Sequence, residues 1–311
     1  MSAGTKFRNA LKDNTPLIIP GAINAYSAIL AEKSGHKAVY LSGGGVAAAS
    51  YGIPDLGITS MEDVLIDVKR ITSASSLPLL VDIDTGWGGA FNIAKTIKNM
   101  IDSGCAAVHI EDQISQKRCG HRPNKSLVSK NEMQDRIKAA LDGRHDEEFF
   151  IMARTDAIAS EGIEGAIDRI GSYVSEGADG IFLEAATTLD EYAAVKKAFN
   201  IPILANITEF GKTPLFTKDE LHQVGVDMIL FPLSAFRAMS KIAEKVYISI
   251  AKEGTQKDLL DIMQSREELY DRLNYHSFEQ KLDELYKEEE KGLQNIMVKK
   301  LEGAGLRGQV A

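Results

Sequence analysis

Eight short apolar runs, each followed by a helical pattern, constrain the fold of this chain more than any other feature. Such near-continuous runs are typical of parallel strands covered on both faces, because a strand with one face in water would alternate. Glycines that end several helical patterns, such as Gly35 and Gly104, fit the left-handed residue that often follows a helix. The expected strands are 16–19, 38–41, 77–83, 106–110, 149–153, 180–183, 202–205 and 228–231.

Eight β/α alternations with short connections predict an α/β fold, specifically a closed (β/α)8 barrel of the TIM type over residues 1–255. An open doubly wound sheet is the rival, but it would leave two strand edges exposed. A dinucleotide-binding sheet would also carry G-x-G-x-x-G after its first strand. The glycines at Gly21 and at 43–45 lack that spacing.

Beyond the expected barrel, residues 256–302 predict a C-terminal helical extension, followed by a flexible tail at 303–311. A helical stripe of apolar residues in this extension needs a partner surface, which is either the same barrel or another subunit. The stripe consists of Phe278, Leu282, Leu285, Tyr286, Leu293 and Met297.

Composition excludes several classes of protein. A net charge of -8 and a pI near 5.4 argue against a general nucleic-acid binder, which needs a basic face. Cys105 and Cys119 are too few for a disulfide framework, and no paired zinc spacing is present. With no apolar segment of the roughly 20 residues that span a bilayer, we expect a cytoplasmic protein without membrane contact.

The stretch Lys-Arg-Cys-Gly-His at 117–121 places one thiol among three potential cations. Nearby positive charge favours the thiolate, so Cys119 is a candidate reactive group, although a lone cysteine is usually an inert small hydrophobe. The surrounding loop, 114–130, is polar and is expected to close over a substrate as a lid.

Polar residues follow nearly every expected strand, where barrel enzymes keep their reactive groups. Asp82 and Asp84 stand two apart, and clustered carboxylates repel unless a cation joins them. Oxygen ligands suit Mg²⁺, with Mn²⁺ as an alternative, and Glu111 and Glu184 on neighbouring strand ends strengthen this interpretation. A solvated loop is the alternative for the aspartate pair alone.

Anion-binding groups are also expected at this end of the barrel. The backbone N–H groups of Ser42, Gly43 and Gly44 are open to close approach by a carboxylate. Arg154 and Arg237, and with them Arg266, are candidates for paired hydrogen bonds to a carboxylate, although each taken singly is equally suited to a surface ion pair.

Four motifs together resemble the isocitrate lyase and phosphoenolpyruvate mutase superfamily over nearly the whole chain. They are Val-Tyr-Leu-Ser-Gly-Gly at 39–44, Asp-Ile-Asp-Thr-Gly-Trp-Gly at 82–88, Glu-Asp at 111–112 and the 117–121 stretch, which is specific for the lyase branch. The resemblance implies a homotetramer in which the last barrel helix is exchanged between subunits, and Mg²⁺ on Asp82 and Asp84. The substrate-binding residues that it implies are Ser42, Gly43, Gly44, Cys119, Gly120, Arg154, Glu184, Asn206, Ile207, Thr208, Arg237 and Arg266.

For activity, the resemblance implies cleavage of the tricarboxylate 2-methylisocitrate to pyruvate and succinate, as in propionate catabolism by the methylcitrate cycle. Phe182, Leu230 and Pro232 resemble a pocket for the substrate methyl group, and isocitrate lyases are usually longer and carry bulkier aromatics there. Cleavage of isocitrate or oxaloacetate by the same chemistry is the alternative. A binding or scaffolding barrel, or a zinc site that includes Cys105, is much less favoured.

In the implied mechanism, Cys119 donates a proton to the carbanion left on the succinate half, and cationic groups stabilise that carbanion. His121 belongs to the catalytic set together with Lys117 and Arg154. Tyr40, Asp55 and Glu111 are the candidates for the base that removes the hydroxyl proton, and the sequence leaves the choice among them open.

Overall fold

The computed structural model describes residues 1–122 and 124–303. The chain divides into two compact units, Met1–Ile248 and a second that begins at Ser249. The division falls within helix α10 (Ser234–Glu253). The expected domain boundary after residue 255 stays a prediction.

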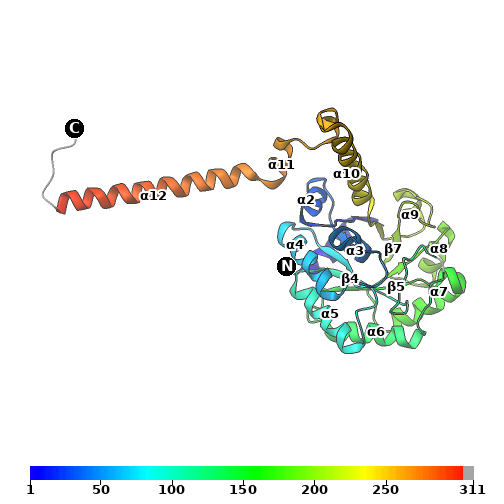
Figure 1. Cartoon of the computed structure of the whole chain (residues 1–311). Coiled ribbons are helices and arrows are strands. Elements are labelled where there is room, and N and C mark those ends of the chain that lie inside the picture. The colour runs from blue at the N-terminus through cyan, green and yellow to red at the C-terminus, as the bar shows by residue number, and fades with distance from the viewer. Residues whose placement is uncertain (123, 304–311) are drawn as a thin grey trace. The chain divides into compact units, whose positions relative to one another are not determined.

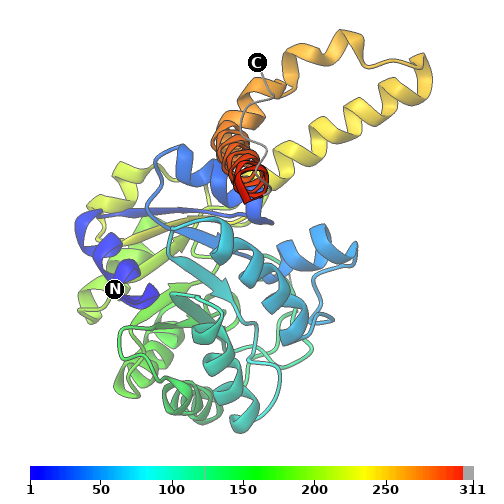
Figure 2. The same ribbon diagram turned by 90° about the vertical axis from the view of Figure 1, so that its left-hand side faces the viewer.

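The first unit contains one eight-stranded parallel sheet surrounded by helices (Figures 1 and 2). All eight expected strands are present, with ends that differ by two residues or fewer, so the predicted (β/α)8 fold is confirmed. A bridge between Gly21 and Tyr40 links the first two strands and closes the barrel. The strands are β1 (Leu17–Pro20), β2 (Val39–Leu41), β3 (Leu79–Asp82), β4 (Ala107–Glu111), β5 (Phe150–Thr155), β6 (Gly180–Leu183), β7 (Ile203–Asn206) and β8 (Met228–Phe231).

The helices begin and end where the local sequence predicts. Ser60 and Thr188 form capping boxes that fix the starts of α4 and α8. Gly35 and Gly104 adopt φ of +90° and +81°, as residues following a helix end do. The remaining bounds are α1 (Ala3–Asp13), α2 (Ala25–Lys33), α3 (Gly43–Tyr51), α4 (Met61–Ala74), α5 (Ala90–Asp102), α6 (Lys130–Gly143), α7 (Ile158–Ser175), α8 (Leu189–Ala198) and α9 (Lys218–Gln223).

Strand side chains alternate between two buried layers. Outward-facing residues such as Val81 and Ile110 pack against the helices. Inward-facing residues such as Leu80 and Met152 fill the barrel, where Phe7 of α1 joins them and contacts Phe150 with ring centroids 5.3 Å apart. Toward the carboxyl ends of the strands, the same inward positions become polar.

The second unit contains the 3₁₀ helix η1 (Lys257–Ile262) and the helices α11 (Arg266–Leu273) and α12 (Tyr275–Gly303). The predicted apolar stripe lies on α12, and all six of its side chains are exposed. The expected exchange of a helix between subunits stays a prediction. Of the expected tail, residues 304–311 lie outside the described part of the chain. None of the described helices is long and apolar enough to cross a membrane.

Candidate active site at the carboxyl ends of the strands

A cavity of about 370 Å³ opens at the carboxyl ends of the strands. Strand alternation explains its walls, because Tyr40, Asp82, Arg154 and Asn206 follow inward-facing core positions on four different strands. The predicted residues that line it are Tyr40, Ser42, Gly44, Asp55, Asp82, Lys117, Cys119, Gly120, His121, Arg154, Phe182, Glu184, Asn206, Thr208, Leu230, Pro232 and Arg237.

The two predicted metal-binding aspartates face the same space, but not because they share a strand. β3 ends at Asp82, and Asp84 lies beyond it with φ +48°. A Cβ on Gly43 would meet Asp84 Oδ1 at 3.1 Å and Asp82 Oδ2 at 3.2 Å. The backbone N–H groups of Asp84 and Gly43 donate to Asp82 at 3.0 and 3.2 Å, which fixes this carboxylate.

Lys117 occupies the acidic side of the cavity. Its Nζ forms an ion pair with Asp84 Oδ1 and lies 2.9 Å from Asp55 Oδ1. Burial favours a neutral amine, but Asp84 and Asp82 hold the pKa of Lys117 well above its ordinary value, so the group is a cation. Burial raises the pKa of Asp84 to about 7, although Lys117 acts in the opposite direction.

Arg154 is clamped from several sides. Its Nε and Nη2 donate to the two carboxylate oxygens of Asp156 at 3.0 and 3.3 Å, and Nε lies 3.3 Å from Glu111 Oε2. Neither carboxylate oxygen of Glu111 accepts a hydrogen bond from a described residue, and burial raises its pKa well above the usual range. Glu111 is thus a buried acid that lacks a strong partner.

The loop after β4 supplies Gly120 and His121, among other residues, to the cavity wall. Gly120 fits only because it has no side chain, since a Cβ there would lie 2.1 Å from Glu184 Oε1 and 2.5 Å from Arg154 Nη2. His121 Nδ1 accepts the backbone N–H of Lys212 at 3.0 Å, so the proton of the neutral ring is on Nε2. That nitrogen lies 3.1 Å from Glu184 Oε1, and burial lowers the pKa of His121.

Cys119 is reachable from solvent, and its surroundings raise the pKa of the thiol. Burial raises the pKa of the Cys119 thiol above its ordinary value of 9.0, and the negative charge of Glu184 raises it further. A hydrogen bond from the His121 backbone lowers this pKa in part. Lys117, expected beside the sulfur, instead pairs with Asp55 and Asp84. The shift therefore favours the thiol of Cys119 over the thiolate that nearby positive charge would favour.

The alkylation of Cys119 by iodoacetamide is expected to follow this raised pKa. Only the thiolate reacts, so the rate rises with pH, and a raised pKa moves the midpoint above that of free cysteine measured in parallel. Cys105 is buried, and its pKa is raised to about 12, so it contributes little labelling. A midpoint below that of free cysteine in the ligand-free protein would contradict this assignment.

Tyr40 is positioned by a residue that the sequence analysis did not single out. Its hydroxyl lies 2.9 Å from His109 Nε2, inside the barrel. Burial, assisted by Asp82, raises the pKa of Tyr40 well above 10, while burial lowers the pKa of His109 to about 4. Tyr40 therefore acts as a hydrogen-bonding group and keeps its proton.

Five predicted residues are not among those that line the cavity. Ile207 has the opposite strand parity to Asn206 and Thr208, so it points outward and packs in the layer between the sheet and the helices. Its side chain therefore does not bind a substrate in the cavity. Arg266 begins α11 in the second unit, and its role stays a prediction. Gly43, Asp84 and Glu111 adjoin the wall through the contacts described above.

The structure also adds residues to the site. Inward strand parity identifies His109, two residues before Glu111, and Asp156, two residues after Arg154. No periodic signal identifies the loop residues that complete the wall. Those are Arg118, Arg122, Glu209, Phe210, Gly211 and Leu233.

Fold and site together define a (β/α)8-barrel enzyme whose cavity combines carboxylates, an arginine and a loop thiol. Residues 7–251 match the model of the phosphoenolpyruvate phosphomutase family. The chain belongs to this family. It is an enzyme, of the carbon–carbon lyase class that its similar relatives represent.

Relatives and solved structures agree with this membership. The chain is 60% identical to 2-methylisocitrate lyase of Shewanella oneidensis, over 93% of this chain and 99% of the relative. The structure of 2,3-dimethylmalate lyase superposes with a TM-score of 0.83 at 30% identity, covering 92% and 96% of the two chains. Phosphonopyruvate hydrolase in complex with oxalate and Mg²⁺ gives 0.79 at 28% identity, covering 90% and 97%.

Proposed function

We propose that this enzyme cleaves 2-methylisocitrate to pyruvate and succinate. The observation that carries the proposal is the position of Cys119 as a protonated thiol over a cavity lined by Arg154, Asn206 and apolar side chains. The similarity to 2-methylisocitrate lyases supports the choice of substrate. In this proposal the enzyme works in the cytoplasm as a homotetramer, within propionate catabolism by the methylcitrate cycle.

A divalent cation fits the acidic side of the cavity. Asp82 and Asp84 face one space, where the Lys117 ammonium pairs with Asp84 and occupies the place of a cation. Within the described ranges, no three His, Cys, Asp or Glu residues cluster as a complete metal site. Magnesium takes one or two carboxylates and completes its shell with water and substrate oxygens, so two aspartates suffice. Mg²⁺ bound there would supply Lewis-acid polarisation of the substrate hydroxyl.

Asp55 is the base that we propose for the hydroxyl proton. It lines the cavity and is half-buried, whereas Tyr40 keeps its proton and Glu111 is buried with a raised pKa. Asp55 takes the proton from the C2 hydroxyl, and the electron pair of that O–H bond forms the new carbonyl of pyruvate as the C2–C3 bond breaks.

Cys119 completes the reaction as the acid. The electron pair of the broken bond is left on the succinate half, where the guanidinium of Arg154 and the Nε2–H of His121 stabilise its negative charge. The S–H of Cys119 gives its proton to that carbon, and the thiolate later regains a proton from solvent. The raised thiol pKa suits an acid that must be protonated before cleavage.

The substrate methyl group would contact Phe182, Leu230 and Pro232, which line the cavity. Arg154 stacks on Phe182 with 5.0 Å from its Cζ to the ring centroid, which fixes this wall. We expect kcat/KM to be about tenfold or more higher for 2-methylisocitrate than for isocitrate, since one methyl group in a pocket is worth about 1–3 kcal/mol. Pyruvate or glyoxylate formation with Mg²⁺ measures the two values.

Leu230→Ala enlarges this wall and is expected to lower the ratio, whereas Leu56→Ala, at an exposed residue outside that cavity's lining, leaves it unchanged. A ratio of one or less in the unmodified enzyme would overturn the substrate assignment. Turnover of oxaloacetate or isocitrate in preference would then identify the alternative lyase.

Metal binding is expected to compete with Lys117, because both use Asp84. Without substrate, Lys117→Met should bind Mg²⁺ about tenfold more tightly, a difference of about 1.4 kcal/mol. Titration calorimetry measures this affinity directly. Lys95→Met is the control, since Lys95 lies 3.9 Å from exposed Glu62, in a surface ion pair. Equal affinities in both variants would show that the cation does not use the Lys117 position.

A further inference from the structure

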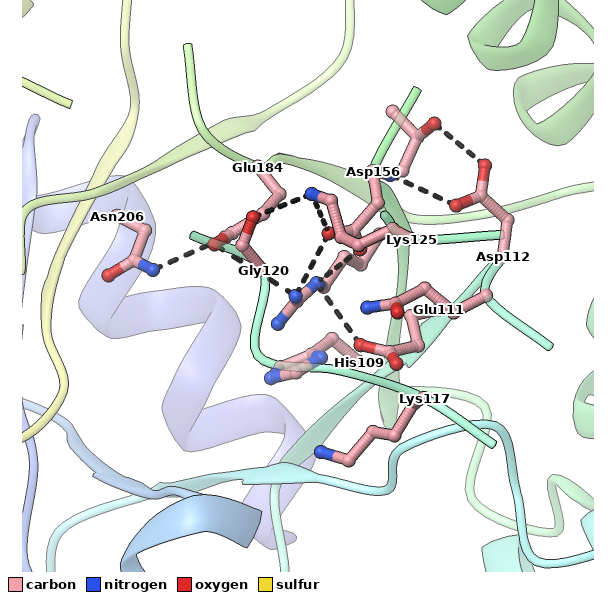
Figure 3. Close-up of polar contacts among 12 residues, drawn as sticks. His109, Glu111, Asp112, Lys117, Gly120, Lys125, Asp156, Glu184 and Asn206 are labelled. Atoms are coloured by element: carbon pink, nitrogen blue, oxygen red, sulfur yellow. Dashed lines mark hydrogen bonds and ion pairs between the residues drawn. The ribbon is translucent and has the colours of Figure 1, made fainter. Parts of the chain in front are cut away.

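Lys125 joins the loop that carries Cys119 to the barrel. Its Nζ donates to the carbonyl oxygen of Gly120 at 2.6 Å and to Asp156 Oδ1 at 2.6 Å (Figure 3). The Lys125 side chain is 4% exposed and that of Asp156 is fully buried. The ammonium thus lies between the residue next to Cys119 and the carboxylate that clamps Arg154.

Asp156 is itself held rigidly. Its backbone N–H donates to Asp112 Oδ1 at 2.9 Å, and the hydroxyls of Thr155 and Tyr173 donate to Asp112 Oδ2 at 2.7 and 2.8 Å. Arg169 Nη1 lies 3.7 Å from the same carboxylate. Asp112 and Asp156 directly follow β4 and β5, and their partners lie on β5 and α7, so the far end of the Lys125 contact is part of the barrel framework.

The loop has two lysine contacts of different kinds. Lys117, near its start, pairs with Asp55 and Asp84, which a metal would also use. Lys125, near its end, pairs with Asp156, whose other polar contacts are Arg154 and the backbone bond to Asp112. A cation that displaces Lys117 therefore leaves the Lys125 contact in place.

We propose that Lys125 is a positioning residue that fastens the loop to Asp156 and thereby sets Gly120 and the thiol of Cys119 against the cavity. Lys125 is not itself among the residues that line the cavity, and it acts through the carbonyl oxygen of Gly120, which is among them. The effect on turnover rests on the proposed lyase function. The effect on the loop does not, so thiol labelling tests it without any substrate.

Lys125→Met keeps the length of the side chain and removes its charge and donors. In the ligand-free full chain, we expect Cys119 to be alkylated about fivefold faster at pH 8, with its midpoint moved toward that of free cysteine, because the released thiol regains solvent. Lys125→Arg should restore both values in large part, since its guanidinium also donates to a carbonyl and a carboxylate. Lys130→Met, which removes the partly exposed Lys130–Asp168 pair, is the matched control.

In the lyase assay, Lys125→Met should lower kcat about a hundredfold while KM changes little, since the misplaced acid affects the chemical step more than binding. Unchanged alkylation kinetics in Lys125→Met would overturn the proposal, whatever happens to activity. Faster alkylation in Lys125→Met but not in Lys130→Met supports it, even if the unmodified enzyme prefers another acid to 2-methylisocitrate.

Discussion

Cys119→Ser is expected to reduce turnover by about 10²–10⁴-fold, the usual contribution of a positioned acid or base. The serine hydroxyl keeps the size of the thiol and its place in the cavity wall, but it is a far weaker acid toward the succinate carbanion. Binding should survive, because in the proposed function the carboxylates of the substrate would contact Arg154 and backbone N–H groups rather than sulfur. Steady-state kinetics and calorimetric titration with succinate in Mg²⁺ measure the two effects.

Cys105→Ser provides the control for this change. Cys105 is buried at the amino end of β4, where its thiol lies 3.1 Å from the Ala107 carbonyl oxygen and 3.4 Å from that of Leu79. A serine there retains a donor for those carbonyls, so turnover should stay close to that of the unmodified enzyme. Turnover in Cys119→Ser equal to that in Cys105→Ser would remove Cys119 from the mechanism.

Gly120→Ala is expected to lower kcat/KM by about a hundredfold or more, because displacing a catalytic group by about 1 Å has effects of that size. The added methyl group would overlap Glu184 Oε1 at 2.1 Å and Arg154 Nη2 at 2.5 Å. Both partners are held by further contacts, so the loop must move instead and carry Cys119 away. The barrel core is untouched, and the melting temperature should change little.

Gly89→Ala is the matched control for Gly120→Ala. Gly89 has φ −79°, which alanine adopts freely, and a Cβ there would have no neighbour within 4 Å. Its kinetics should match those of the unmodified enzyme, while melting curves of both variants confirm folding. Full activity in Gly120→Ala would mean that the loop seats differently when substrate is present.

Much of the site follows from the sequence once the barrel is recognised. Tyr40, Asp82, Arg154 and Asn206 were predicted from strand ends, and the structure brings them to one cavity. This works because parallel strands share an end, so residues after successive strands become neighbours. Ile207 shows the limit of this reasoning. Its outward direction follows from the alternation along β7, but only once the residue at which β7 begins is known.

The loop was predictable only in part. Its thiol and glycine stand in a recognisable stretch, yet the roles of Lys117 and Lys125 depend on Asp55, Asp84 and Asp156, which lie far away in the chain. Ion pairs between residues far apart in the chain leave no periodic pattern in the sequence. The second unit shows the same limit. The sequence predicted the apolar stripe of α12 but not the surface that covers it.

By itself, the sequence determined the order of strands and helices, and with it the end of the barrel at which polar residues gather. Only the tertiary structure decided the electrostatics there. It directs Lys117 to carboxylates instead of to Cys119. Burial, with Glu184 nearby, raises the pKa of the Cys119 thiol. The physical reason is that a pKa depends on burial and on distances between charges, which hydrophobic periodicity does not encode.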